Sequence, residues 1–261
     1  MTHSSKKILW ILMIIASACS SGCVQYSQYK QAQQAYVAEA DYLAPFSTIA
    51  ITGNANVELT QGATSAIFIT GQKQYVENVN ATVINHTLYI NKNTSSPVVI
   101  KLQTAYVLNN ILVSNNSNLS GKNFASKNLT ISASNSANIN LNGEFDVANI
   151  NQTGNGKIEI QWINSDNLKI TSHNQGHIYL AGTVDNLTGY LFNSSSLEAR
   201  YLRAKQATIM TTNYAMATIF AIKTLNAYAD NNSGIFYYKR PLEFNKVTKD
   251  SGNALLLEEL K

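Results

Sequence analysis

Cysteine, proline and charged residues are scarce in this chain of 261 residues. Its two cysteines, Cys19 and Cys23, both lie near the N-terminus, so the remainder contains no disulfide, thiol nucleophile or cysteine-ligated zinc site. Charged residues make up 13% of the chain and the net charge is only +4. Without a basic stripe or an acidic block, we expect no nucleic-acid partner. The fold must therefore be stabilised by packing and backbone hydrogen bonds.

The N-terminus carries the pattern of a secretory signal. Two lysines precede an apolar run from Ile8 to Ile15, which is shorter than the roughly 20 residues needed to span a bilayer. Small residues and Cys19 follow. The run Ala16-Ser17-Ala18-Cys19 resembles a lipobox, in which the cysteine thiol receives a diacylglycerol carrying fatty acyl chains such as palmitate. We therefore predict a lipoprotein signal peptide over residues 1–18.

Cys23 is the alternative acylation site. Cys19 is favoured because Ile15 and Ala16 keep the upstream side apolar, whereas cleavage before Cys23 has the merit of leaving no spare thiol. Neither cysteine is followed by Asp. Resemblance to the sorting rule of Gram-negative lipoproteins then implies the outer membrane, on its periplasmic or its cell-surface face. Residues 19–43 are predicted to form a tether.

The middle of the chain repeats itself roughly every 19 residues. Apolar residues recur in four columns, the first of them at steps of 19, 20, 19, 20 and 18. The columns are Leu129, Ala148, Leu168, Leu187, Ala207, Leu225; Ile131, Ile150, Ile170, Gly189, Ile209, Ala227; Ile139, Ile158, Ile178, Leu197, Ala217, Ile235; and Leu141, Ile160, Leu180, Ala199, Ile219, Tyr237. Such a period with β-type alternation is typical of a solenoid. We predict an all-β, parallel β-helix-like solenoid over residues 44–245, with 246–261 as a C-terminal cap or tail.

The segment before these repeats, from Phe46 to about Leu108, also alternates with period two, which indicates short strands. It opens with Phe46-x-x-Ile49-x-Ile51-x-Gly53-x-x-x-Val57-x-Leu59-x-Gln61-Gly62, then continues with Leu88-Tyr89-Ile90 and Val98-Val99-Ile100-Lys101-Leu102. This order resembles the bacterial family described as "putative auto-transporter adhesin, head-GIN domain", over roughly residues 46–240. The resemblance implies stacked β-helix coils and frequent lipidation, and it implies no known molecular function.

A polar turn separates the second apolar column from the third. One of its positions reads Asn135, Gly154, Asn174, Asn193, Asn213 and Asn231. Asn and Gly adopt left-handed backbone angles at low cost, and Asn side chains stacked at the ~4.8 Å strand spacing can hydrogen-bond along the stack. We interpret this column as a turn ladder rather than as a ligand surface.

Two other polar patterns are candidate metal sites. The coil ends carry the column Asp146, Asp166 and Asp185, flanked by Lys127 and Lys205, but the glycine-rich calcium repeat is absent. His173 and His177 are four apart, yet the columns place them at exposed turn positions rather than on one helix face. We expect no metal and no cofactor.

The best candidate for catalysis is a pair of carboxylates. Glu159 and Glu198 share one outward column two coils apart, with Tyr179 between them. Two coils correspond to roughly 9.6 Å, which is near the upper limit for an inverting glycosidase. Glu and Tyr also alternate commonly on the outer face of a strand, so we favour a chain that is not an enzyme.

Aromatic residues gather in the later coils. Those that alternate outward are candidates for facing a ligand: Trp162, Tyr179, Tyr201 and Tyr214. The competing interpretation is that the last coils need large fillers and a cap, for which Lys239-Arg240-Pro241 is suited.

Together these patterns predict a non-catalytic, lipid-anchored envelope protein with a role in adhesion or scaffolding. Its partners would be the membrane, through the lipid, and an envelope polysaccharide or a surface protein. The alternative is a β-helix protein that binds or cleaves polysaccharide.

Overall fold

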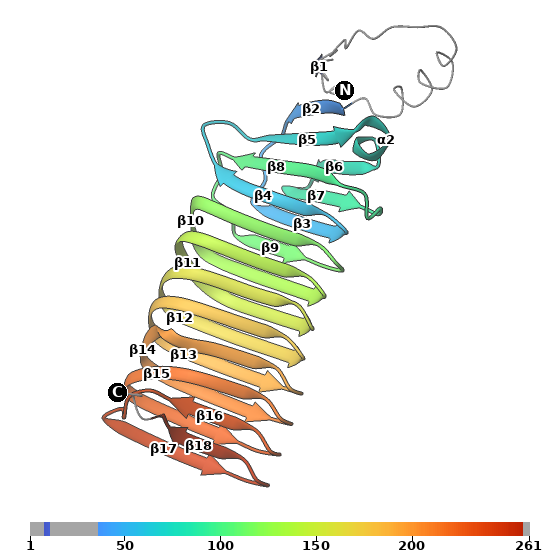
Figure 1. Cartoon of the computed structure of the whole chain (residues 1–261). Helices are drawn as coiled ribbons and strands as arrows, with labels where there is room; N and C mark the ends of the chain where they lie inside the picture. The colour runs from blue at the N-terminus through green and yellow to red at the C-terminus, as the bar shows by residue number, and fades with distance from the viewer. Residues whose placement is uncertain (1–7, 11–35, 258–261) are drawn as a thin grey trace, which may run out of the picture.

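The chain folds into a β-solenoid whose coils stack into a rod (Figure 1). The structure is a computed structural model, and it describes residues 8–10 and 36–257. The predicted solenoid is confirmed. Cys19, Cys23 and most of the predicted signal and tether lie outside the described residues. In the described part, no helix is both long and apolar enough to cross a bilayer.

Six long strands form the regular coils. They are β10 (Asn118–Asn135), β11 (Asn138–Gly154), β12 (Lys157–Asn174), β13 (His177–Phe192), β14 (Ser196–Thr212) and β15 (Met216–Ala229). Each of them runs through one sheet, bends, and continues through a second sheet that faces the first (Figure 1). We call the first sheet A and the second sheet B. The bends form one edge of the rod, the bend edge, and the tight turns between successive coils form the opposite edge, the turn edge.

The remaining strands extend both sheets at the two ends of the rod. They are β1 (Ile8–Trp10), β2 (Tyr36–Tyr42), β3 (Thr48–Gly53), β4 (Asn56–Gln61), β5 (Ala66–Gln72), β6 (Val79–Ile84), β7 (Thr87–Lys92), β8 (Val98–Thr104), β9 (Asn110–Val113), β16 (Gly234–Tyr237), β17 (Glu243–Thr248) and β18 (Asn253–Leu256). Sheet A has the order β1-β2-β5-β8-β4, then β10 to β15, then β16 and β18. Sheet B has the order β6-β7-β3-β9, then β10 to β15, then β17.

The N-terminal end of the rod departs from the parallel pattern. β5 pairs antiparallel with both β2 and β8, and β6 pairs antiparallel with β7, while the one-turn helix α2 (Lys73–Val76) joins β5 to β6. Sequence alternation predicts these strands but not their direction, because inside and outside alternate identically in parallel and antiparallel strands.

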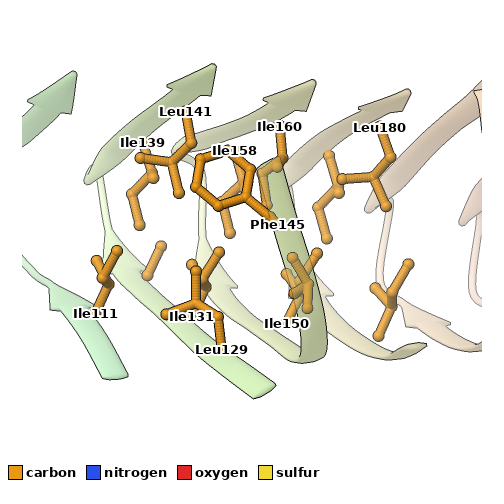
Figure 2. Close-up of a cluster of buried hydrophobic side chains, with 14 of the residues drawn as sticks. Ile111, Leu129, Ile131, Ile139, Leu141, Phe145, Ile150, Ile158, Ile160 and Leu180 are labelled. Carbon is orange, nitrogen blue, oxygen red and sulfur yellow. The ribbon is translucent and has the colours of Figure 1, made fainter. Parts of the chain in front are cut away.

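The predicted apolar columns fill the interior (Figure 2). Ile131, Ile150, Ile170, Gly189, Ile209 and Ala227 are in direct register on successive strands. One assignment is wrong: Val147, not Ala148, pairs with Leu129 and is fully buried. The ladder shifts by one residue at this bend, so Ala148 is the extra residue of a β-bulge, which a constant period cannot predict.

One more turn of the solenoid, which begins at Glu243, continues into the segment 246–261 that is predicted as a cap or tail. β17 stacks parallel on β15, and β18 stacks parallel on β16. The N-terminal strands and this last coil lie at opposite ends of the rod (Figure 1). From β2 to β18, sheet A rises by about 50 Å at the usual strand spacing.

Candidate binding surfaces

The turn edge carries the predicted ladder. All six residues of the column have positive φ, from +50° at Asn231 to +116° at Gly154. The Asn213 side-chain amide donates to Asn193 Oδ1 at 3.1 Å, and Asn231 donates to Asn213 Oδ1 at 3.1 Å. The side chains at the C-terminal end of the column are therefore hydrogen-bonded to one another, as a structural turn ladder requires.

Two residues of the acidic column, Asp146 and Asp185, and both histidines also contact neighbouring coils. Asp185 pairs with Lys205 at 2.6 Å, and Asp146 accepts a hydrogen bond from the backbone N–H of Asn128 at 3.2 Å. His173 stacks on Phe192, while His177 hydrogen-bonds to Ser196. Across the described residues, no group of three or more His, Cys, Asp or Glu side chains is placed to hold a metal ion.

The two candidate carboxylates lie in the predicted column on sheet A, and each is held by a basic residue. Glu159 and Glu198 both pair in register with Tyr179. Lys157 Nζ lies 2.8 Å from Glu159, and its hydrogen bond lowers the pKa of that carboxyl below its usual value. Arg200 binds Glu198 through Nε at 2.8 Å and Nη2 at 2.6 Å. A glycosidase needs one carboxylic acid with a raised pKa, which is the opposite of what Lys157 does to Glu159.

The four candidate aromatic residues separate onto three surfaces. Tyr179 lies on the outer face of sheet A beneath Lys157, whose Nζ is 4.6 Å from the ring centroid. Tyr214 lies on the turn edge, next to the Asn ladder. Trp162 and Tyr201 lie together on the bend edge and line one hollow of about 590 Å³, which we call the bend slot. The four residues therefore do not form one continuous strip.

The bend slot is lined by residues of four neighbouring strands, β11 to β14. Trp162 comes from β12 and Tyr201 from β14, and their side chains are 67% and 72% exposed. Between them lies β13, which contributes only the small residues Ala181 and Gly182 and the short side chain of Thr183. The two rings thus flank a floor that has no large side chain of its own.

A strained backbone holds Trp162 in this position. In β12, Gln161 and Trp162 lie opposite the single residue Ala181, which makes Trp162 part of a β-bulge, and its φ is +66°. A left-handed backbone at a residue with a Cβ costs roughly 1–2 kcal/mol. In β10 the corresponding extra residue is Asn123, with φ +54°, which is the residue type expected there. The bend therefore tolerates an unfavourable residue whose ring faces solvent.

Gly182 is required by the same bend. Its φ is +136°, and a Cβ at this position would lie 2.1 Å from the carbonyl oxygen of Ile163. The sequence pattern predicted Trp162 and Tyr201 as candidates, but it missed Gly182, because the repeat defines interior and turn columns and leaves the bend residues unassigned.

Polar side chains line the rest of the slot. Thr183 Oγ1 donates to Asn164 Oδ1 at 3.2 Å, and Asn142 donates to Gln161 Oε1 at 3.2 Å from outside the slot. Glu144 forms no ion pair within the part of the chain that the structure describes. Hydrogen-bond donors and acceptors thus surround an apolar floor, and no lysine or arginine lines the slot.

The fold and its surfaces define a two-sheet β-solenoid with an aromatic slot on one edge. Residues 45–241 match the model of the family described as "Putative auto-transporter adhesin, head GIN domain". The chain belongs to this family, as the order of its opening strands predicted. Membership indicates an adhesin-like protein of the cell surface or envelope. No curated protein matches the chain.

Solved structures share the fold at low sequence identity. The chain is similar to a "putative lipid binding protein" from Parabacteroides distasonis ATCC 8503, with a TM-score of 0.77 and 19% identity over 85% of this chain and 97% of that chain. It is also similar to a "putative adhesin" from Parabacteroides merdae ATCC 43184, with a TM-score of 0.74 and 17% identity over 85% and 96%. These similarities establish the architecture alone.

Proposed function

We propose that this chain is a non-catalytic lipoprotein of the outer membrane that acts in adhesion or scaffolding at the cell envelope. The observation that carries the proposal is the placement of the two ends. The predicted acylation sites, Cys19 and Cys23, precede β2, and β2 belongs to the end of the rod opposite β18 (Figure 1). A lipid at the N-terminus would therefore hold one end of a rod about 50 Å long, and the last coils would stand away from the membrane.

The membership of an adhesin family supports the adhesive part of this proposal. The ion pairs at Glu159 and Glu198 support the absence of catalysis, because each carboxylate is held by a basic side chain of its own strand. Polysaccharide cleavage is the alternative function. Glu159→Gln and Glu198→Gln test this alternative directly. If the wild-type chain cleaves a glycan and either substitution abolishes the cleavage, the proposal of a non-catalytic adhesin is wrong.

Lipid attachment is tested by metabolic labelling with radioactive palmitate. We expect the wild-type chain to incorporate label, Cys19→Ala to lose it, and Cys23→Ala to retain it. If only Cys23→Ala loses the label, Cys23 is the acylated residue. Accumulation of a precursor in cells treated with globomycin is expected as well, and normal processing without label would contradict the anchor.

Adhesion is tested on intact cells. A strain deleted for this chain is expected to attach less to polysaccharide-coated or protein-coated surfaces than the parent strain, and re-expression of the wild-type chain is expected to restore attachment. Equal attachment of the deletion strain, together with an unchanged envelope, would contradict both the adhesive and the scaffolding role.

A further inference from the structure

The bend slot between Trp162 and Tyr201 has the dimensions of a site for one flat ring. Trp162 and Tyr201 come from strands two coils apart, so their backbones are separated by roughly 9.6 Å. A ring in van der Waals contact with an aromatic plane on each side needs those planes about 7–8 Å apart. Ala181 and Gly182 leave this space open at its floor.

The chemistry of the slot selects among possible rings. Its walls are aromatic faces, its floor is apolar, and its rim offers amide, hydroxyl and carboxylate groups from Gln161, Asn164, Thr183 and Glu144. A sugar ring matches this set, because its C–H faces are apolar and its edge carries hydroxyl groups that donate and accept hydrogen bonds. Precisely placed polar groups on an apolar site are what fix the orientation of a small ligand.

The charge of the slot favours a neutral ligand over an anionic one. No lysine or arginine lines it, and Arg200, whose Cζ lies 6.0 Å from the centroid of the Tyr201 ring, is held by both oxygens of Glu198. Glu144 adds one negative charge to the rim. A nucleotide or an acidic sugar would have its anionic group next to Glu144 without a cation to pair with, whereas a neutral sugar would hydrogen-bond to that carboxylate.

The backbone strain at Trp162 is a further observation, besides the shape and the chemistry of the slot. Asn123 occupies the corresponding bulge of β10 with the same backbone conformation at lower cost. At φ +66°, Trp162 keeps an exposed indole where packing into the interior does not require one. Tyr214 has the same φ of +66°, so this strain supports a binding role for Trp162 only together with the neighbouring Tyr201 in the slot.

We propose that the bend slot binds a neutral hexopyranose unit of an envelope or surface polysaccharide, stacked between Trp162 and Tyr201. This inference rests on the proposed adhesive function and supplies its ligand class. Trp162 and Tyr201 contact the two faces of the ring. Asn164, Gln161 and Glu144 bind its hydroxyl groups. The slot is closed by the two rings along the bend edge and is open across it, so that it admits an internal unit of a chain.

The test uses the full chain in a zwitterionic detergent without a sugar headgroup, with cellohexaose, xylohexaose, mannohexaose and chitohexaose as neutral probes and hexagalacturonate as the acidic one. Binding is measured by tryptophan fluorescence and by calorimetry. At least one neutral probe is expected to bind with a Kd on the order of 1 mM or below, while hexagalacturonate binds at least ten-fold more weakly. No saturable binding of any neutral probe, or equal binding of the acidic one, would overturn the proposal.

Three substitutions make the test specific. Trp162→Asn places the residue type of Asn123 in the bulge, so it is expected to keep the fold while weakening binding at least ten-fold. Tyr201→Ala is expected to weaken binding to a similar extent. Tyr214→Asn is the matched control, since it also removes an exposed aromatic ring from a left-handed position, on the opposite edge of the rod. It is expected to leave the Kd unchanged within two-fold. If the Trp162→Asn variant binds the saccharide as tightly as the wild type, the bend slot is not the binding site.

The same variants separate this inference from the proposed function in the attachment assay. Attachment that depends on the chain but is unaffected by Trp162→Asn would leave the adhesive function standing and overturn the slot as its ligand site. Saccharide binding that requires Trp162, in a chain whose deletion does not change attachment, would support the slot and contradict the adhesive function.

Discussion

Lys246 Nζ lies 3.1 Å from the backbone carbonyl oxygen of Ala254, across the open end of the last coil. Lys246 continues an interior column, because it pairs in register with the buried Ala227. Ala254 belongs to the opposite sheet, where it pairs with Ile235. The last coil thus places a charged side chain where every earlier coil has an apolar one. An interior charge at an edge strand discourages another chain from stacking there.

Replacing Lys246 should therefore expose the end of the rod to self-association. We expect Lys246→Leu to shift the chain from monomer toward dimers or longer end-to-end assemblies, because it continues the apolar column to the surface. Sedimentation velocity at several protein concentrations measures this. Lys239→Leu removes the same charge from an exposed position in the segment that the sequence suggested as the cap. If Lys246→Leu and Lys239→Leu associate to the same extent, the loss of one positive charge, and not the position of Lys246, causes the association.

The Asn ladder contributes through two separable effects. Asn213→Ala removes two side-chain hydrogen bonds and puts a less tolerant residue at φ +55°, so we expect a loss of about 1–3 kcal/mol of unfolding free energy. Asn213→Gly removes the same hydrogen bonds but keeps the backbone freedom, as Gly154 does in the same column. Urea denaturation of both variants measures the difference. Equal losses would mean that backbone conformation contributes little at this turn.

The Lys157–Glu159 pair predicts a small pH dependence of stability. The hydrogen bond from Lys157 lowers the folded-state pKa of Glu159 below its usual 4.5, so its contribution is present above that value and is lost as the pH falls through the folded-state pKa. Both side chains are partly exposed, which limits the contribution to about 0.5 kcal/mol.

A double-mutant cycle with Lys157→Met and Glu159→Gln measures this coupling. We expect a coupling energy of about 0.5 kcal/mol at pH 7 that disappears near pH 2. A coupling energy that stays constant over this range would show that packing of the side chains, rather than charge, joins the two residues.

The parts of the molecule that the sequence predicted are those governed by local rules. The interior positions of sheets A and B follow from alternation, and the left-handed turns follow from the Asn and Gly at positions such as Asn174 and Gly154. Both signals depend on the residue itself and on its immediate neighbours.

The unpredicted parts depend on contacts between distant strands. Alternation at Ile67 and Ile100 is the same whichever way β5 and β8 run, so their antiparallel pairing was not predicted. The bends vary in length from coil to coil, which moved Val147 into the column assigned to Ala148. The bend slot could not be predicted for the second reason, the variable bends. Trp162 and Tyr201 line one hollow only because two separate coils bend at matching places.

Phe145 is one of the large, fully buried side chains of the interior, and its removal should destabilise the rod locally. Its side chain is 1% exposed and packs edge-to-face against Phe124 with ring centroids 4.9 Å apart. Gly143 lies against both residues, so that a Cβ there would be 2.1 Å from the carbonyl oxygen of Phe124. Phe145→Ala should leave a cavity that this tight backbone cannot close, at a cost of about 3–5 kcal/mol, and Phe145→Leu should cost less.

Because each coil contacts only its neighbours, the effect of Phe145→Ala should be confined to part of the rod. We expect amide hydrogen exchange to accelerate in β10, β11 and β12 and to stay near the wild-type rate in β14 and β15. Exchange measured by mass spectrometry on the wild-type and variant chains resolves these strands, and Tyr179→Ala on the outer face of sheet A serves as the control for loss of an aromatic ring without a cavity. Uniform acceleration over all coils would mean that the rod unfolds as one cooperative unit, in which case the stack does not behave as a series of nearest-neighbour repeats.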